Sequence, residues 1–289
     1  MHTSKPKRMP AVAGMFYESD PQALRAQIEW AFKHELGPGE LPKIPSERRR
    51  LSAAFICPHA GYMYSGPIAA HAYYQIAIEG GADTFIIIGP NHTGLGTLVS
   101  IMPKGVWVTP LGEVEIDEEL ASEILKNSEY ADPDEKAHML EHSVEVQVPF
   151  LQYLFNGRFK IVPIVVYEHS LEVAKDLANA IIKAIKTLNR DVVLIASSDF
   201  THYEPHDVAV SKDSMAIKAI EELNVEKFER IVTTYNLSIC GPGPIMVAMI
   251  YSKNVGCKHA RLLKYATSGD VTGEKAAVVG YAAIQFPIQ

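Results

Sequence analysis

The stretch Cys57-Pro58-His59-Ala60-Gly61-Tyr62-Met63-Tyr64-Ser65-Gly66 follows a short apolar run, residues 51–56, that is typical of a buried strand. Pro58 has no backbone N–H to donate, so we expect the strand to end there. The two glycines predict a turning loop that leads to a helix over residues 67–78. Ligands of open α/β sheets bind beyond the carboxyl ends of the strands. His59 is therefore placed for chemistry, although a histidine that only caps a turn is the alternative.

The same arrangement occurs twice more along the chain. Residues 84–89 form an apolar run that Pro90-Asn91-His92 follows, and residues 191–196 form another that leads into Ser197-Ser198-Asp199-Phe200-Thr201-His202. In a parallel sheet, these strand ends would meet at one edge. Three strand ends that each deliver a histidine favour one shared site over three unrelated loop histidines.

Apolar runs and amphipathic segments alternate from one end of the 289-residue chain to the other. This alternation predicts a three-layer α/β/α sandwich with a mostly parallel or mixed sheet. No internal repeat or shift in composition marks a boundary, so we expect a single domain over residues 1–289. The sequence contains neither GxGxxG after the first strand nor GxxxxGK[ST], and nucleotide binding is not indicated.

Charge and cysteine content narrow the class of protein. The formal net charge of −7 argues against nucleic acid as the main partner, because nucleic-acid binding depends on neutralising phosphates. No apolar run approaches the ~18–20 residues that a membrane span needs, and no apolar signal core follows the N-terminal basic residues. Three cysteines without a CxxC motif favour a reducing compartment over a disulfide framework. We therefore expect a cytoplasmic protein with no membrane partner.

His59, His92 and Cys240 form the candidate set of metal ligands. Two neutral imidazoles and a thiolate suit iron, copper or zinc. Cys240 precedes a Gly-Pro-Gly-Pro run at an expected helix start, a position that would lower its pKa. A buried free cysteine beside a glycine turn is the alternative. Asp199 and His202 could add further ligands, or His202 could carry protons while Asp199 orients it. A turn-capping role for Asp199 also stays open.

The segment His138-Met139-Leu140-Glu141-His142 matches the H-x-x-E-H pattern of inverzincin proteases, in which two histidines bind zinc beside a catalytic glutamate. The spacing would place His138 and His142 one turn apart on a helix that we expect to continue to about residue 154. A zinc peptidase is therefore one hypothesis, although no third ligand is marked. The other is that Glu141, His142 and Glu145 line the rim of the pocket built by the strand ends.

Several motifs occur in order along nearly the whole chain: Pro-His-Ala-Gly-Tyr at 58–62 with Ser65-Gly66, Gly-Pro-Asn-His at 89–92, Glu-His-Ser-Val-Glu at 141–145, Ser-Ser-Asp-Phe-Thr-His at 197–202, Ile-Cys-Gly at 239–241 and Tyr-Ala-Thr-Ser at 265–268. Together they resemble the Memo family (mediator of ErbB2-driven cell motility), whose microbial members are labelled AmmeMemoRadiSam system protein B. The resemblance implies a fold like that of the class III extradiol dioxygenases, non-haem iron enzymes that open catechol rings.

The resemblance also implies site residues. The family's metal-binding positions correspond to His59, His92 and Cys240, with iron or copper as the expected metal ahead of zinc, and Asp199 and His202 match other pocket residues. Extradiol dioxygenases hold iron with two histidines and a glutamate, so the cysteine departs from their pattern and argues against ring cleavage. The family label alone suggests a functional link to a radical-SAM protein.

Two functions follow from these observations. The first is a metal-dependent redox protein, an oxidoreductase if it is an enzyme, in which His202 and Asp199 would act as catalytic residues near the metal. The second is a binding module that retains an enzyme fold without its chemistry. In that case Tyr62, Tyr64 and His202 would contact an anionic or aromatic group on a small molecule or a peptide.

Overall fold

Four parallel strands form the centre of the protein, whose computed structural model describes residues 5–288. In spatial order they are β8 (Lys160–Val166), β3 (Thr84–Pro90), β9 (Val192–Ser197) and β2 (Ser52–Cys57). Nearly all of their residues are buried, as expected for strands rich in Val and Ile with both faces covered. The strands predicted at 84–89 and 191–196 are confirmed.

Within residues 5–288, eight further strands extend the sheet: β1 (Lys7–Arg8), β4 (Val99–Ile101), β5 (Val106–Thr109), β6 (Gly112–Ile116), β7 (Ala131–Pro133), β10 (His202–Glu204), β11 (Arg261–Thr267) and β12 (Val278–Pro287). Beyond β8 the order continues through β6 and β5 to β1 at the edge. Beyond β2, β12 runs antiparallel and also pairs with β10 and β11. The sheet is therefore mixed: β6 pairs parallel with β8 and extends the central parallel run, whereas β5 and β12 run antiparallel to their neighbours β6 and β2.

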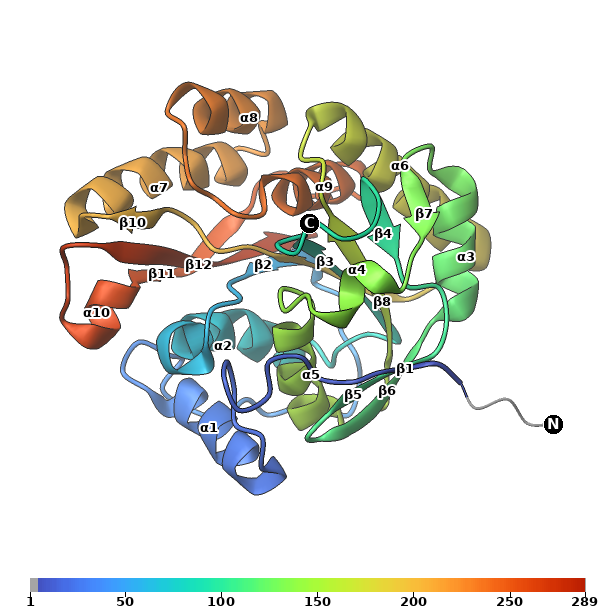
Figure 1. The fold of residues 1–289 in the computed structure, drawn as a ribbon, viewed down its shortest axis with the longest axis horizontal. Coiled ribbons are helices and arrows are strands. Elements are labelled where there is room, and N and C mark those ends of the chain that lie inside the picture. Colours follow the sequence, from blue (N-terminus) through green and yellow to red (C-terminus); the bar gives the residue numbers. More distant parts are fainter. Residues whose placement is uncertain (1–4, 289) are drawn as a thin grey trace.

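Helices cover both faces of the sheet (Figure 1). One face carries α1 (Pro21–Lys33), α2 (Tyr62–Ile78) and α5 (Val148–Phe155), and the other carries α3 (Glu118–Asn127), α6 (Leu171–Leu188), α7 (His206–Glu221), α8 (Val225–Thr234) and α9 (Pro242–Asn254). Short helices lie in the connections: α4 (Lys136–Met139), the 3₁₀ turn η1 (Glu145–Gln147) and α10 (Ser268–Thr272). The predicted α/β/α sandwich is confirmed. No helix among residues 5–288 has the length and apolar composition needed to cross a membrane.

Local sequence signals set the bounds of α6. Its first turn is capped by Ser170, whose side chain accepts a hydrogen bond from the backbone N–H of Val173. Val173, Leu177 and Ile181 recur at helical spacing and are buried against the sheet side of the helix. Asn189 then adopts a left-handed conformation with φ of 50° and ends the helix.

α2 begins earlier than predicted, at Tyr62 instead of Pro67, so Gly66 and Pro67 lie inside the helix. Gly66 is not a turn residue, because it lies in the second turn of α2. A Cβ placed on it would lie in van der Waals contact, at 3.4 Å, with the Cβ of Ala31 in α1. Burial of the residues that follow outweighs the cost of a proline inside the helix, which is about 3 kcal/mol.

Candidate metal centre

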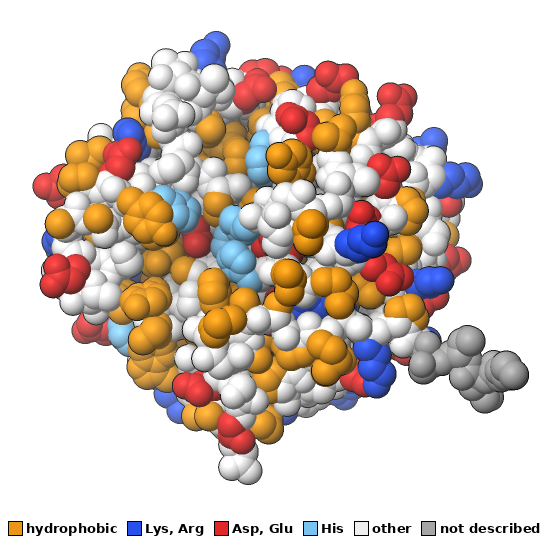
Figure 2. All heavy atoms as spheres, viewed as in Figure 1, with side chains coloured by type: hydrophobic (Ala, Val, Ile, Leu, Met, Phe, Trp, Pro, Cys, Tyr) orange, Lys and Arg blue, Asp and Glu red, His pale blue; other side chains and the backbone are white. Residues whose placement is uncertain are grey.

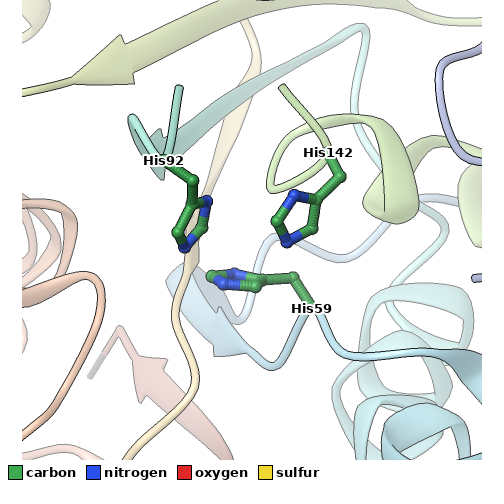
Figure 3. A group of neighbouring side chains, drawn as sticks. All are labelled: His59, His92 and His142. Atoms are coloured by element: carbon green, nitrogen blue, oxygen red, sulfur yellow. The ribbon is translucent and has the colours of Figure 1, made fainter. Parts of the chain in front are cut away.

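Neighbouring parallel strands bring the predicted histidines to one edge of the sheet. His59 lies two residues beyond the end of β2 and His92 two residues beyond the end of β3, while β9 runs between these strands. A third histidine, His142, enters from the segment between α4 and η1. The ligand nitrogens of the three imidazoles lie within 4.8 Å of one another, and the rings are turned toward one another in Figure 3.

The three imidazoles lie in a cavity of about 500 Å³. Figure 2 shows histidine side chains gathered in a hollow on this face of the molecule. Cys240, which precedes α9, lies in the same cavity, with its Sγ 3.2 Å from Nε2 of His59. The other walls include Phe16, Asp199, His202, Tyr203, Ser238 and Val279. The structure therefore brings the predicted ligands together with the predicted pair Asp199 and His202. His142, which the sequence placed at the rim of the pocket, lies beside the two ligand histidines.

Glu141 bonds the ring of His92 and lies close to that of His142. Its Oε1 lies 2.8 Å from Nδ1 of His92 and 3.5 Å from Nδ1 of His142. The backbone N–H groups of His92, His142 and Ser143 also donate to this carboxylate. Burial alone would raise the pKa of Glu141, but these hydrogen bonds and the His92 ring lower it to about 2. The carboxylate is therefore ionised and accepts a hydrogen bond from Nδ1–H of His92, which leaves Nε2 of that ring free.

Burial keeps His59 and His142 neutral near pH 7. It lowers the pKa of His59 well below the ordinary value, and the neighbouring imidazoles add to this effect. The pKa of His142 is lowered to about 4, first by burial and then by His92. Neutral imidazole is the form that binds a metal ion. The two rings are thus held in the state that ligation requires.

The pKa of the Cys240 thiol is raised, whereas the sequence predicted that it would be lowered. Burial raises the pKa of its thiol, and the nearby Asp199 carboxyl raises it further, so the helix start does not produce a thiolate. The Sγ atom does accept a hydrogen bond of 3.1 Å from the backbone N–H of Asp199. A bound metal ion would deprotonate such a thiol when it coordinates the sulfur.

Asp199 and His202 share the cavity but have different partners. Asp199 accepts a 2.8 Å hydrogen bond from the backbone N–H of His59, and burial raises its pKa to about 6. Nδ1 of His202 lies 2.8 Å from the carbonyl oxygen of Ser238, and so must donate to it. The orienting partner of His202 is therefore Ser238, where the sequence suggested Asp199.

Similar proteins identify the family. The family model for Memo-like proteins matches residues 8–285. The chain belongs to the Memo family. MEMO1 family proteins of Sulfolobus acidocaldarius and Ignicoccus hospitalis are 53% and 52% identical to it over 281 residues. These matches cover 96% and 97% of this chain and 99% of each relative. The resemblance drawn from the motifs is thereby confirmed.

Two tyrosines that the sequence places in the pocket lie elsewhere in this Memo-family chain. Tyr62 is buried, and its hydroxyl donates to the carbonyl oxygen of Val146. Its ring packs against Tyr17 and Phe150, so it supports the site from within the core. Tyr64 is 37% exposed at the start of α2. Neither is among the described residues that line the cavity.

Glu145 is also buried away from the cavity rim. It forms an ion pair with Arg8 and accepts hydrogen bonds from the backbone N–H groups of Ala11 and Val12 and from the Tyr17 hydroxyl. These bonds fix the N-terminal arm, residues 5–17, against η1. The arm places the Phe16 ring 4.7 Å from that of His142. No local pattern marks Phe16 as a cavity residue, because its position depends on this long-range network.

The H-x-x-E-H segment does not place both histidines on one helix in this Memo-family chain. α4 ends at Met139, and the carbonyl of His138, which would accept from His142 in a continuing helix, accepts from Nε of Arg8 instead. His138 is fully buried, and neither of its ring nitrogens has a well-formed hydrogen bond among residues 5–288. The predicted continuous helix is wrong, and the zinc-peptidase arrangement loses its geometric basis.

We expect the neutral state of His138 to make the fold sensitive to acid. Burial, followed by the positive charge of Arg8, lowers the pKa of His138 to about 3. In the unfolded chain, His138 binds a proton below about pH 6.5, whereas in the folded protein it stays neutral down to about pH 3. Protonation of the unfolded chain therefore lowers the free energy of unfolding as the pH falls from about 6.5 toward 3, and has no effect above about pH 6.5. Between pH 7 and pH 4, the free energy of unfolding should fall by about 2–3 kcal/mol less in His138→Phe than in wild type. Urea denaturation at both pH values measures this difference, and parallel pH profiles would contradict it.

Proposed function

We propose that this Memo-family protein binds a transition-metal ion, iron or copper, in the cavity at the strand ends. His59, His92 and His142 would supply imidazole nitrogens, and Cys240 would supply a thiolate. The proposal rests on the three ligand nitrogens that lie within 4.8 Å of one another. Imidazole and thiolate donors suit iron, copper and zinc, whereas magnesium and calcium prefer oxygen ligands.

The surroundings of the imidazoles support this donor set. Nδ1 of His59 meets Ser197 Oγ at 2.9 Å, and Nδ1 of His92 meets Glu141 Oε1 at 2.8 Å. Nδ1 of His142 lies 3.5 Å from the same carboxylate oxygen. The rings of His59 and His92 therefore have Nε2 available for a metal ion. Metal-binding histidines usually have such a carboxylate, hydroxyl or carbonyl partner on the other ring nitrogen.

The protein would contribute positioning and proton handling. A bound iron or copper ion would supply one-electron redox chemistry. His202 donates its Nδ1–H to Ser238, so its Nε2 can accept a proton at the cavity wall. The Phe16 ring shields His142 on the side of the N-terminal arm. The chain's own groups would thus limit water access and hold a proton beside the metal.

We expect the purified protein to bind about one metal ion per chain. Protein made without a metal-binding tag is reconstituted anaerobically with Fe²⁺ or Cu⁺, and elemental mass spectrometry measures the bound metal. The double variant His59→Ala/His92→Ala should lose it, whereas His34→Ala/His206→Ala, with both histidines outside the cavity, should retain it. A wild type that stays metal-free under these conditions would refute the proposal and favour the non-catalytic binding module. Metal-dependent turnover of a catechol, thiol or peroxide that Cys240→Ser abolishes would exclude that module.

A further inference from the structure

A buried chain of hydrogen bonds lies directly behind His59. It consists of Tyr73, Gln147, Ser197 and the backbone of Ser143, whose side chains are at most 1% exposed. The sequence motifs include Ser143 and Ser197 but neither Tyr73 nor Gln147, and the metal-binding proposal above does not use this set of hydrogen bonds as a whole. Each of its members has a defined number of protons, so the direction of every hydrogen bond can be assigned.

The amide of Gln147 has only one orientation that fits its neighbours. Its Nε2 lies 2.9 Å from the carbonyl oxygen of Pro58 and 2.8 Å from Ser197 Oγ. A carbonyl oxygen can only accept, so the atom that faces Pro58 must be the NH₂ group. Oε1 then accepts from the hydroxyl of Tyr73. Gln147 therefore donates one hydrogen bond to Ser197.

Ser197 has one hydroxyl proton, and its destination is also fixed. Ser197 Oγ lies 2.6 Å from the carbonyl oxygen of Ser143, which can only accept. The proton must therefore point to Ser143. With its proton committed and one lone pair facing Gln147, Oγ can only accept from its remaining neighbour, Nδ1 of His59 at 2.9 Å.

We propose that Ser197 is a positioning residue that fixes the tautomer of His59, with the proton on Nδ1 and the lone pair on Nε2. This inference rests on the proposed function, because it explains how one proposed ligand is prepared for the metal ion. The tautomer itself is a property of the metal-free protein. Nε2 is the atom that lies 3.2 Å from Cys240 Sγ. The buried hydrogen bonds behind His59 therefore direct its lone pair into the cavity before a metal ion binds.

The same buried hydrogen bonds also connect the separate segments that carry the other proposed ligands. Ser143 belongs to the segment that includes His142, and its own hydroxyl donates to the carbonyl oxygen of Pro90, two residues before His92. A Cβ on Gly89 would lie 2.3 Å from this hydroxyl oxygen, so only glycine leaves room for the contact. A single buried network thus links all three histidine segments.

The tautomer can be measured directly in metal-free protein. Long-range ¹H–¹⁵N NMR of histidine-labelled protein distinguishes a protonated ring nitrogen from one with a lone pair, and the spectrum of His59→Ala assigns the His59 signals. We expect Nδ1–H in wild type and in Ser197→Thr, which keeps the hydroxyl. Ser197→Ala should shift His59 toward Nε2–H, because Nδ1 then lacks its acceptor. The dissociation constant of the Ser197→Ala variant for Fe²⁺ should rise by about 10–100-fold, as it does when other polar partners of metal-binding histidines are removed.

Ser252→Ala is the matched control, because Ser252 is a fully buried serine of α9 whose hydroxyl has no well-formed hydrogen bond among residues 5–288. It should leave the His59 signals unchanged. A wild-type His59 with its proton on Nε2 overturns the proposal, and this measurement stands even if Ser197→Ala does not fold. A folded Ser197→Ala that keeps Nδ1–H overturns the role of Ser197. A wild type that binds no metal would refute the proposed function and leave the tautomer assignment intact.

Discussion

Replacing Arg8 by alanine should lower the free energy of unfolding by about 3–5 kcal/mol, the usual effect of removing one partner of a buried ion pair. Arg8 and Glu145 are both fully buried and paired with each other. The substitution would leave the Glu145 carboxylate in the interior without its cation. It would also remove the donors to the carbonyl oxygens of His138 and Glu141, at 2.9 and 2.7 Å, and the guanidinium that lies 4.5 Å above the Trp107 ring.

The neighbouring residue provides the control for this prediction. Lys7 lies on the same strand and pairs with Glu113, but about half of each side chain is exposed. Lys7→Ala should therefore cost no more than about 1 kcal/mol. Urea denaturation of wild type and both variants at pH 7 measures the difference. An equal decrease in the free energy of unfolding in the two variants would contradict the prediction, because the buried ion pair would then stabilise the fold no more than the exposed one.

The strand ends could be predicted from sequence because their signals are local. An apolar run followed by proline or serine shows where a parallel strand stops, and parallel strands place those stops at one edge. This is enough to bring His59, His92 and Asp199 to one place. The order of β3, β9 and β2 within the sheet is not needed for that inference.

The place of His142 among the clustered histidines could not be predicted in the same way. The helical spacing of His138 and His142 is a local pattern, but Arg8, which is 130 residues away from His138 in sequence, takes the carbonyl that a continuing helix would use. The chain turns at Leu140, and only His142 enters the cavity. The placement of Phe16 has the same origin, because hydrogen bonds to Glu145 fix the arm that carries it.

Gly66 illustrates the opposite kind of error. Glycine next to proline is a strong local signal for a turn, yet here the pair lies inside α2. The packing of this position against Ala31 of α1 is a tertiary contact that no local pattern contains. Local signals were therefore reliable where the backbone ends a strand, and they failed where packing between distant segments decides the conformation.

We expect metal affinity to separate His202 from the proposed ligands. His59→Ala and Cys240→Ala should each weaken Fe²⁺ or Cu⁺ binding by more than about 100-fold, because a lost ligand costs more than a lost partner of a ligand. His202→Ala should keep most of the affinity, since His202 is not part of the three-histidine cluster and Ser238 holds its Nδ1. If the protein catalyses a proton-coupled reaction, the same variant should instead lose about 10²–10⁴-fold in rate. Anaerobic isothermal titration measures the affinities, and a His202→Ala as weak as His59→Ala would make His202 a ligand.

His142→Ala completes this comparison, because it distinguishes two possible ligand sets. The motifs imply His59, His92 and Cys240, whereas the geometry adds His142 as an equal member of the cluster. If His142 is a ligand, its alanine variant should lose affinity as His92→Ala does. If His142 only lines the cavity, the loss of metal affinity in His142→Ala should be as small as that in His202→Ala. The ring of His142 stacks on His92 at 4.6 Å and shares the Glu141 carboxylate with it, so we expect the first result. Thermal unfolding of each variant provides the control, since a ligand substitution should change metal binding far more than the stability of the metal-free fold.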